Sequence, residues 1–550
     1  MVLAFGALGV RLFQLQARDQ HQLTSLGEGQ RLQTVQLAAS RGTIFDRNGV
    51  DLAVSVPQTT ITADPRLIKD PAGYAAVLAP VVGVDQTALE NRLAAPNSAF
   101  AYVARKVDDP TAAKVRALGL TGILFVPESK RFYPSDRLAA PVLGFVGTDN
   151  NGLGGLEYLY ESTLRGKAGR LQVERDPQGN AIPGGAHRVR ASQRGQDLVL
   201  TIDRYLQFKT EQVLTEEVAR AGAKGGMAIL VDVRTGDVLS MATVGGVTDT
   251  EPARTAAATA LSAPVATAYE PGSTNKVITM AAAIQEGVVE PTTEINNVGS
   301  SIRVGDKDYE DVESHQSTMT VADILRESSN VGTIKIAALL GKERFDRYLR
   351  AFGFGHTTTL GLPGESAGTL LALANYNDTS MGSMPIGSGI SVTAMQMLDV
   401  YTTIANGGVA RSPRIIAATL DADGKRHDDP LLPTHQVVSA ETAAKVTAML
   451  TGVVNSGTGV KAQVAGYTVA GKTGTARKAP YDTPPYKYVA SFVGFAPAEN
   501  PRLAAIVVLD EPRGGSYFGG DVAAPAFSQI MQEALRVERV PPTAPAVATP

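Results

Sequence analysis

The 550-residue chain has no cysteine, which excludes disulfide bonds, thiolate nucleophiles and cysteine-based metal sites. Histidine is also scarce: the six residues are scattered without H-E-x-x-H spacing, so we expect neither a metal nor a cofactor. A formal net charge of -3 gives no electrostatic reason to expect a nucleic-acid partner. What remains is a sizeable globular chain whose 44% hydrophobic content is enough for a large core.

The N-terminus has only a short apolar run. Val2 to Val10 is apolar, and Arg11 interrupts the run. A helix that spans a membrane needs about 20 apolar residues. The segment is therefore either an amphipathic helix or the outer part of a membrane anchor that begins upstream of Met1.

The length predicts two or three domains. Near the start of the chain, Asn48-Gly49 is typical of a hairpin turn between two short strands. The polar stretch from His187 to Gln196 is predicted to be a linker, which places the main domain boundary near Gly195.

Five strand patterns lie at the two ends of the second domain, with mostly helical patterns between them. They predict a five-stranded antiparallel sheet with helices on its faces, which is an α+β fold. An amphipathic helix over Ala523 to Val537 closes the domain. The predicted strands are Met227–Val233, Val238–Ala242, Thr468–Lys478, Val489–Ala496 and Arg502–Asp510.

Three short strings stand in one order along the chain: Ser273-Thr274-Asn275-Lys276, Ser328-Ser329-Asn330 and Lys472-Thr473-Gly474-Thr475. Each string alone has an ordinary explanation as a helix cap, a turn or a surface strand. Together they supply a nucleophile, a base, a proton-relaying hydroxyl, an amide and a cation for a carboxylate. That set of groups indicates acyl transfer.

Ser273 is predicted to lie at the start of a helix, because apolar residues recur at helical spacing from Val277 to Ile284 before Gly287 ends the run. Residues at i and i+3 share a helix face, so the Lys276 amine can lie beside the Ser273 hydroxyl. Apolar surroundings would favour the neutral amine that a base requires. The amides at the helix start can stabilise an oxyanion.

Ser328 and Asn330 are predicted to lie in a turn between two helices. Thr320 to Asp323 resembles a capping box that opens the first helix, and Val331 to Leu340 forms the second. In such a turn Ser328 can relay a proton and Asn330 can hold a substrate amide.

Lys472 to Thr475 is predicted to lie on a strand, with Lys472 and Thr473 on opposite faces and Gly474 allowing another backbone to approach. The edge of a strand can dock a peptide. The Lys472 charge and the Thr473 and Thr475 hydroxyls would receive its carboxylate, and the Thr475 amide would be a second oxyanion donor.

A competing motif overlaps this strand, because residues 466–473 satisfy the P-loop pattern G-x-x-x-x-G-K-[ST]. A P-loop requires a helix that begins at its lysine. Gly474 and the prolines that follow it deny such a helix. Nucleotide hydrolysis therefore stays only as an alternative from another class.

The three strings resemble those of the class B penicillin-binding proteins, which are monofunctional peptidoglycan D,D-transpeptidases, and the septal cell-division type is preferred. The resemblance extends over nearly the whole chain and includes no glycosyltransferase domain. It implies a partial membrane anchor over 1–17, a mixed pedestal (dimerisation) domain over 18–195 and a transpeptidase domain over 196–540. The composition of 541–550 predicts a disordered tail. Further similar strings are RGTIFDRNG (41–49), GLGGLE (152–157), YEPGST (269–274) and GGDVAAP (519–525).

The resemblance implies that the penultimate D-Ala carbonyl of a stem pentapeptide acylates Ser273, with Lys276 as general base. Ser328 and Lys472 would deliver the proton to the leaving amine, and Asn330 would position the substrate amide. An amine of a neighbouring stem peptide would then resolve the acyl-enzyme. A β-lactam would instead trap Ser273 as a stable ester.

For the substrate carboxylate, the resemblance implies binding by Lys472, Thr473 and Thr475, with the Ser273 and Thr475 amides as the oxyanion hole. Two residues depart from the usual pattern. Asn275 stands where many relatives carry an aromatic or another residue, and Ser388 stands where glutamine is common.

Other functions remain open at this point. A serine β-lactamase would use a similar trio, but no E-x-x-x-N string lies between Ser328 and Lys472 to activate the deacylating water. A penicillin sensor or a non-catalytic divisome scaffold is the non-enzymatic alternative. If the chain is a transpeptidase, its implied partners are stem peptides, β-lactams, a lipid-linked glycan polymerase and division proteins. The implied location is the bacterial cell membrane, with a single-pass anchor and an extracytoplasmic catalytic domain.

Overall fold

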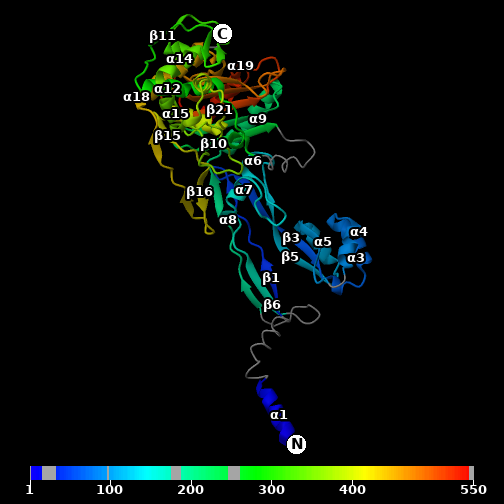
Figure 1. Cartoon of the computed structure of the whole chain (residues 1–550). Coiled ribbons are helices and arrows are strands. Elements are labelled where there is room, and N and C mark those ends of the chain that lie inside the picture. The colour runs from blue at the N-terminus through cyan, green and yellow to red at the C-terminus, as the bar shows by residue number, and fades with distance from the viewer. Residues whose placement is uncertain (1, 15–31, 96–97, 175–186, 246–260, 544–550) are drawn as a thin grey trace.

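The predicted five-stranded antiparallel sheet lies at the centre of the C-terminal body (Figure 1). In this computed structural model, which describes residues 2–14, 32–95, 98–174, 187–245 and 261–543, the strand order is β10-β9-β21-β20-β19. All four pairings are antiparallel, so the prediction is confirmed. The strands are β9 (Gly225–Asp232), β10 (Val238–Gly245), β19 (Ala470–Arg477), β20 (Tyr488–Ala496) and β21 (Leu503–Asp510).

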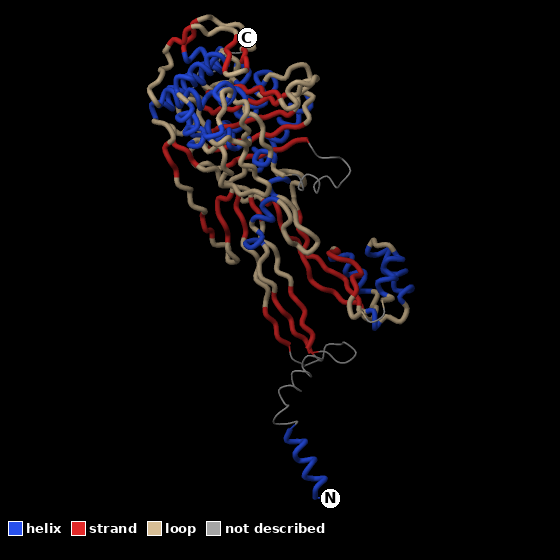
Figure 2. The backbone as a smooth tube through the Cα atoms, in the orientation of Figure 1, coloured by secondary structure: helices blue, strands red, loops and turns tan. Residues whose placement is uncertain are grey.

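Helices cover both faces of this sheet, as Figure 2 shows. Along β9, Ile229 and Val231 join one hydrophobic cluster while Ala228 and Leu230 join the other, because successive strand residues point to opposite faces. Helix α17 packs on the first face, and α9 and α20 pack on the second. The main helices are α9 (Arg204–Arg220), α12 (Lys276–Gln285), α13 (Val321–Arg326), α14 (Asn330–Leu340), α15 (Lys342–Ala351), α17 (Ala394–Ala405), α18 (Ala440–Ser456) and α20 (Ala524–Val537).

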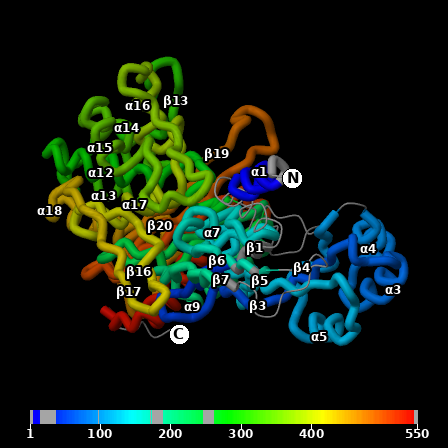
Figure 3. The backbone as a smooth tube through the Cα atoms, turned by 90° about the horizontal axis from the view of Figure 1, so that it is seen from below, coloured from blue at the N-terminus to red at the C-terminus, as the bar shows by residue number. Residues whose placement is uncertain are grey.

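The N-terminal region contributes strands to a seven-stranded sheet and also forms a separate sheet of three strands. In the first, β3 (Asp51–Ala63) pairs with β4 (Ala101–Val107) and β5 (Ile123–Phe132). Three helices, α3 (Pro71–Val82), α4 (Gln86–Leu93) and α5 (Asp109–Ala117), gather beside this sheet and stand apart from the C-terminal body (Figure 3). The Asn48-Gly49 turn joins β2 (Ile44–Phe45) to β3, as predicted.

The second sheet corrects one prediction. Residues His187 to Arg190 form strand β7, not a linker, and β7 pairs with β6 (Gly169–Glu174), which in turn pairs with β1 (Leu32–Leu37). β7 belongs to a narrow sheet of three strands that projects from the body (Figure 1). Its polar composition is similar to that of a linker, which explains the wrong prediction. On β7 the apolar side chain that the structure describes, Val189, is 65% exposed, so the sequence carries no buried apolar pattern there that would indicate a strand.

The seven-stranded sheet that contains β3, β4 and β5 also joins the N-terminal region to the C-terminal body. Strand β8 (Asp197–Leu200) pairs in parallel with β2 and antiparallel with β16 (Ile416–Leu420), which comes from the body. The boundary predicted near Gly195 lies directly before β8. Smaller strands of the body are β11 (Glu294–Asn296), β12 (Ser301–Val304), β13 (Lys307–Glu310), β14 (Thr318–Thr320), β15 (Val409–Arg411), β17 (Arg426–Asp428) and β18 (Thr434–Gln436).

The chain begins with helix α1 (Val2–Phe13), at the opposite end of the molecule from the C-terminal body (Figure 1). Among the described helices, none has both the length and the apolar character needed to cross a membrane. The predictions for residues 15–17 of the N-terminal segment and for 544–550 of the tail lie outside the described residues. Residues 541–543 have no regular secondary structure.

A buried ion cluster lies in the core of the N-terminal region. Arg41 Nε donates to Glu157 Oε2, and Arg131 Nε donates to Glu157 Oε1 at 2.7 Å. Arg131 also donates to the Gly42 carbonyl at 2.7 Å, and Glu161 supplies a second carboxylate for Arg41. Because Glu157 is fully buried, its charge depends on these partners instead of on water.

Replacing Glu157 with alanine should strongly destabilise the protein, because it leaves the guanidinium groups of Arg41 and Arg131 buried with too little negative charge. Removal of one partner from a buried ion pair costs about 3–5 kcal/mol. The thermal midpoint of Glu157→Ala should therefore fall well below that of the wild type. The chain has no tryptophan whose fluorescence could report unfolding, so far-UV circular dichroism is used to follow the transition.

A matched control is Asp428→Asn, which removes an ion pair with Arg426 whose side chains are both largely exposed. Its thermal midpoint should stay close to that of the wild type. Equal midpoints for the two variants would contradict the importance of the buried cluster.

Candidate active site

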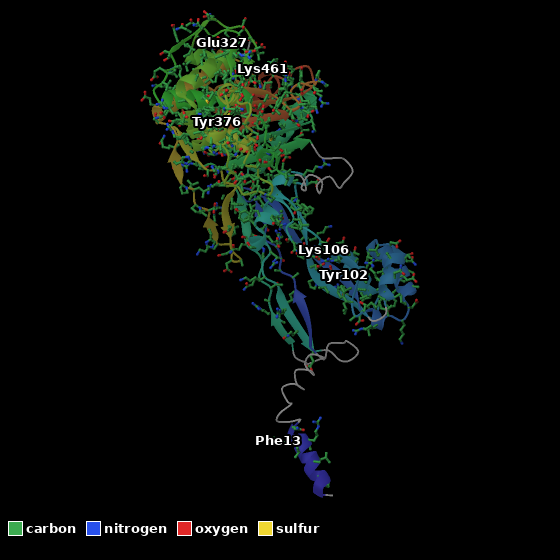
Figure 4. The ribbon with its side chains drawn as sticks, in the orientation of Figure 1. Phe13, Tyr102, Lys106, Glu327, Tyr376 and Lys461 are labelled. Atoms are coloured by element: carbon green, nitrogen blue, oxygen red, sulfur yellow. The ribbon has the colours of Figure 1, made fainter. Side chains whose placement is uncertain are left out.

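The three strings meet at one cavity of about 440 Å³ in the C-terminal body. Glu327 and Lys461 also line it, and Figure 4 shows both far from Phe13 at the other end of the molecule. The two predicted lysines, Lys276 and Lys472, are fully buried behind the cavity wall. The predicted site residues that line the cavity are Ser273, Ser328, Asn330, Thr473 and Thr475.

A larger cavity of about 690 Å³ lies beside this one and shares Ala476 and Arg477 with it. Its lining includes none of the predicted site residues. The candidate site is therefore the smaller cavity, because the residues of the three strings line it.

Ser273 lies in a tight 3-10 turn, η3 (Gly272–Asn275), and the α-helix α12 starts only at Lys276. The α-helix thus begins three residues later than predicted. Gly272 enters the turn with φ at +57°, a conformation that glycine adopts without strain. A Cβ at Gly387 would lie 2.1 Å from the Gly272 carbonyl oxygen, so two glycines meet directly before Ser273.

Hydrogen bonds to the neighbouring backbone hold this turn in place. Asn275 Nδ2 donates to the Met384 carbonyl at 2.8 Å, and Tyr401 Oη donates to the Thr274 carbonyl at 2.9 Å. Asn275, which departs from the usual pattern at its position, is therefore a buried contact of the turn and does not line the cavity.

Lys276 Nζ lies within hydrogen-bond reach of the second string. It is 2.6 Å from the Ser328 carbonyl oxygen, 2.8 Å from Asn330 Oδ1 and 3.3 Å from Ser328 Oγ. Burial lowers the pKa of Lys276 to about 7, while the negative charge of Asp311 opposes the shift. A neutral amine can donate to the two closer oxygens and keep its lone pair for a proton.

The second string occupies the predicted turn between two helices. Thr320 and Asp323 form the predicted capping box at the start of α13. Ser328 follows that helix with φ at +62°, and Ser329 caps α14 by accepting a hydrogen bond from the Gly332 N–H at 2.9 Å. Ser328 in this left-handed conformation lies between α13 and α14. Its backbone and hydroxyl oxygens lie near Lys276 Nζ.

The third string lies on β19, the edge strand of the five-stranded sheet. Lys472 Nζ lies 3.2 Å from Thr473 Oγ1, which in turn lies 2.7 Å from Thr458 Oγ1. Burial holds the pKa of Lys472 well below its usual range, and a positive charge on Lys276 lowers it further. A Cβ at Gly474 would lie 3.0 Å from the Pro271 carbonyl oxygen, which confirms the predicted close approach of another backbone.

The P-loop alternative is excluded by the same strand. β19 continues through Lys472 and pairs with β20 up to Arg477, so no helix begins at this lysine. Without that helix, the backbone amides cannot form a phosphate cradle.

One residue of the site has no counterpart in the predictions. The Asp311 side chain, which is 1% exposed, accepts hydrogen bonds from Ser329 Oγ at 2.7 Å and from the Asn330 and Val331 backbone N–H groups. Asp311 directly follows β13, and only tertiary packing brings it to the start of α14. No local spacing could have linked it to Asn330.

Comparison with known proteins shows the family of the chain. Residues 226–532 match the family described as "Penicillin binding protein transpeptidase domain", and residues 36–200 match "Penicillin-binding Protein dimerisation domain". The chain is 34% identical to the peptidoglycan D,D-transpeptidase FtsI of Escherichia coli K12 over 553 residues, which cover 99% of this chain and 91% of FtsI. It is 33% identical to the probable peptidoglycan D,D-transpeptidase PenA of Neisseria gonorrhoeae, over 100% of this chain and 93% of PenA.

Solved structures have the same architecture. A penicillin-binding protein 3 from Mycobacterium tuberculosis, complexed with aztreonam, has a TM-score of 0.71 and 30% identity, covering 93% of this chain and 99% of that one. A peptidoglycan synthetase from Bifidobacterium adolescentis has a TM-score of 0.77 and 29% identity, covering 94% and 98% of the two chains. With an N-terminal dimerisation domain followed by a transpeptidase domain, this chain belongs to the class B penicillin-binding proteins.

Proposed function

We propose that the protein is a serine-type peptidoglycan D,D-transpeptidase that crosslinks stem peptides through an acyl-enzyme on Ser273. The observation that carries this proposal is the fully buried Lys276 amine. It is held by Ser328 and Asn330 behind the cavity that Ser273 lines. The similarity to FtsI and PenA over nearly the whole chain supports the same reaction.

In the first half-reaction, Lys276 takes the proton of the Ser273 hydroxyl as the oxygen attacks the penultimate D-Ala carbonyl. The new C–O bond forms and the C–N bond to the terminal D-Ala breaks. Ser328, whose Oγ lies 3.3 Å from Lys276 Nζ, passes the proton to the leaving amine together with Lys472. Asn330 orients the amide of the substrate.

The second half-reaction reverses these roles. An amine of a neighbouring stem peptide attacks the Ser273 ester, a new amide forms, and the hydroxyl regains its proton. A β-lactam carbonyl is attacked in the same way, but the ester that it forms is stable.

The terminal carboxylate of the donor peptide binds at β19, where Lys472, Thr473 and Thr475 present a cation and two hydroxyls. Because burial depresses the pKa of Lys472, an arriving carboxylate restores the positive charge that binds it. A charged Lys472 in turn favours the neutral form of Lys276. The Ser273 and Thr475 amides form the oxyanion hole, which is supported by the close packing of Gly272 against Thr475.

We place the active domain, over 196–540, outside the cytoplasm on a pedestal over 18–195, with the N-terminal anchor over 1–17 in the membrane. The support is helix α1, whose apolar side chains are largely exposed, for example Phe5 at 71% and Phe13 at 70%. A septal role, with a lipid-linked glycan polymerase and division proteins as partners, rests on the similarity to FtsI. Recruitment of a fluorescent fusion to the division site tests the septal role, and uniform side-wall signal would contradict it.

Fluorescent penicillin should label the wild-type protein stably and should not label Ser273→Ala, because the ester oxygen comes from Ser273. Mass spectrometry of penicillin-treated protein should place the adduct on Ser273. Labelling that survives Ser273→Ala would refute the acyl-enzyme. Rapid loss of the label would instead indicate a β-lactamase.

The acylation rate should rise with pH and reach half of its maximum near pH 7, because only the neutral Lys276 amine accepts the Ser273 proton. The measurement is the second-order rate constant of labelling by fluorescent penicillin as a function of pH. Half-maximal rate near the ordinary lysine pKa of 10.5 would show that burial does not activate this amine.

A crosslinking assay separates a transpeptidase from a penicillin sensor or an idle scaffold, since sensors also label stably. With a donor pentapeptide and an acceptor amine, the wild type should release D-Ala and form the crosslinked product. Lys472→Ala should lose most of both, because it removes the cation that binds the carboxylate. Stable labelling without any crosslinked product would favour the sensor or scaffold.

A further inference from the structure

Beside the Ser328 turn lies a group of ionisable side chains that the acyl-transfer steps do not use, and two of them, His315 and Glu327, line the cavity. We name Asp311, His315 and Glu327 the acid–histidine cluster. His315 lies between the two carboxylates, with Nδ1 3.0 Å from Glu327 Oε2 and Nε2 3.7 Å from Asp311 Oδ2. The side chains of His315 and Asp311 are 6% and 1% exposed, whereas that of Glu327 is 37% exposed at the cavity.

The Asp311 end of the cluster holds the start of α14. Asp311 Oδ1 accepts from the Asn330 and Val331 backbone N–H groups, and Oδ2 accepts from Ser329 Oγ at 2.7 Å. A carboxylate is favoured at a helix N-terminus. These bonds fix Asn330, whose Oδ1 lies 2.8 Å from Lys276 Nζ.

The Glu327 end holds the end of α13. Glu327 is the residue that ends this helix, and its Oε1 accepts a hydrogen bond from Arg326 at 2.7 Å. Between the two helix ends lies Ser328, whose φ of +62° is uncommon for a residue with a side chain. His315 therefore links the two helix ends on either side of Ser328. The left-handed backbone of Ser328 is unfavourable for a residue with a side chain, so this turn depends on its surroundings.

We propose that His315 is a positioning residue for acylation: by bridging Glu327 and Asp311, it holds Ser328 and Asn330 where they orient the Lys276 amine toward Ser273. This inference rests on the proposed function. His315 acts through other residues and needs no contact with the reacting atoms.

Charged groups from several elements lie near the cluster and contribute to the electrostatic potential there. Glu313 comes from the same loop, and Arg326 comes from α13. Lys276 of α12 is close enough for Asp311 to raise its pKa. Lys461 and Asp521 line the same cavity and pair with each other at 2.8 Å.

The test compares variants of the full chain by the rate constant and pH profile of acylation with fluorescent penicillin. His315→Phe keeps an aromatic ring but loses both polar contacts, and should lower the rate constant by about 10- to 100-fold, as loss of an orienting partner does elsewhere. His315→Gln keeps a donor for one carboxylate and should recover part of the rate. Asp311→Asn should move the half-maximum of the pH profile below that of the wild type, because the charge that raises the pKa of Lys276 is gone.

The matched control is His427→Phe, since His427 lies 3.1 Å from Asp421 in an exposed histidine–carboxylate pair on another part of the body. Its rate constant and pH profile should equal those of the wild type. Wild-type kinetics for a folded His315→Phe would overturn the inference. If His315→Phe does not fold, His315→Gln decides: a lowered rate with a displaced pH profile supports the inference, and an unchanged profile overturns it. Absence of Ser273 labelling in the wild type would be a failure of the proposed function instead.

Discussion

Two lysine amines are buried within electrostatic reach of each other, and the rest of the active site depends on that constraint. Desolvation lowers the pKa of both Lys276 and Lys472, and the charge on Lys276 further disfavours the charge on Lys472. Water does not solvate these amines, so protein oxygens must do so. Lys276 Nζ donates hydrogen bonds to oxygens of Ser328 and Asn330, and Lys472 Nζ donates one to Thr473 Oγ1. In the proposed mechanism, this pair supplies one amine as a base and a second amine that binds a carboxylate.

The oxygens that contact the two buried amines are held in place by backbone conformations that ordinary helices and strands do not provide. Gly272 and Gly387 pack against each other ahead of the nucleophile, and Gly474 lies against the Pro271 carbonyl. Ser328 adopts a left-handed conformation although it has a side chain, and the capped ends of α13 and α14 hold it there. The five-stranded sheet supplies the rigid edge against which these segments are placed.

Local patterns predicted much of this structure. The continuous apolar runs of the central strands, the Thr320 capping box and the Asn48-Gly49 turn each depend on residues close in sequence, and each is confirmed. Tertiary packing decided the rest. Pairing with β6 makes His187–Arg190 a strand, and the approach of Gly387 accompanies a 3-10 turn at Ser273 where a helix was expected. Asp311 and His315 reach the site only because their loop packs against α13 and α14, which no spacing in the sequence reveals.

The central claim is that the fold itself makes Lys276 a base near neutral pH, before any substrate binds. Nuclear magnetic resonance of protein labelled with ¹³C and ¹⁵N in lysine tests this directly, with the Lys276 signal assigned by its absence from Lys276→Met. The account predicts that the Lys276 Cε resonance titrates near pH 7 in the free protein. Titration near 10.5, the ordinary value for lysine, would contradict the account.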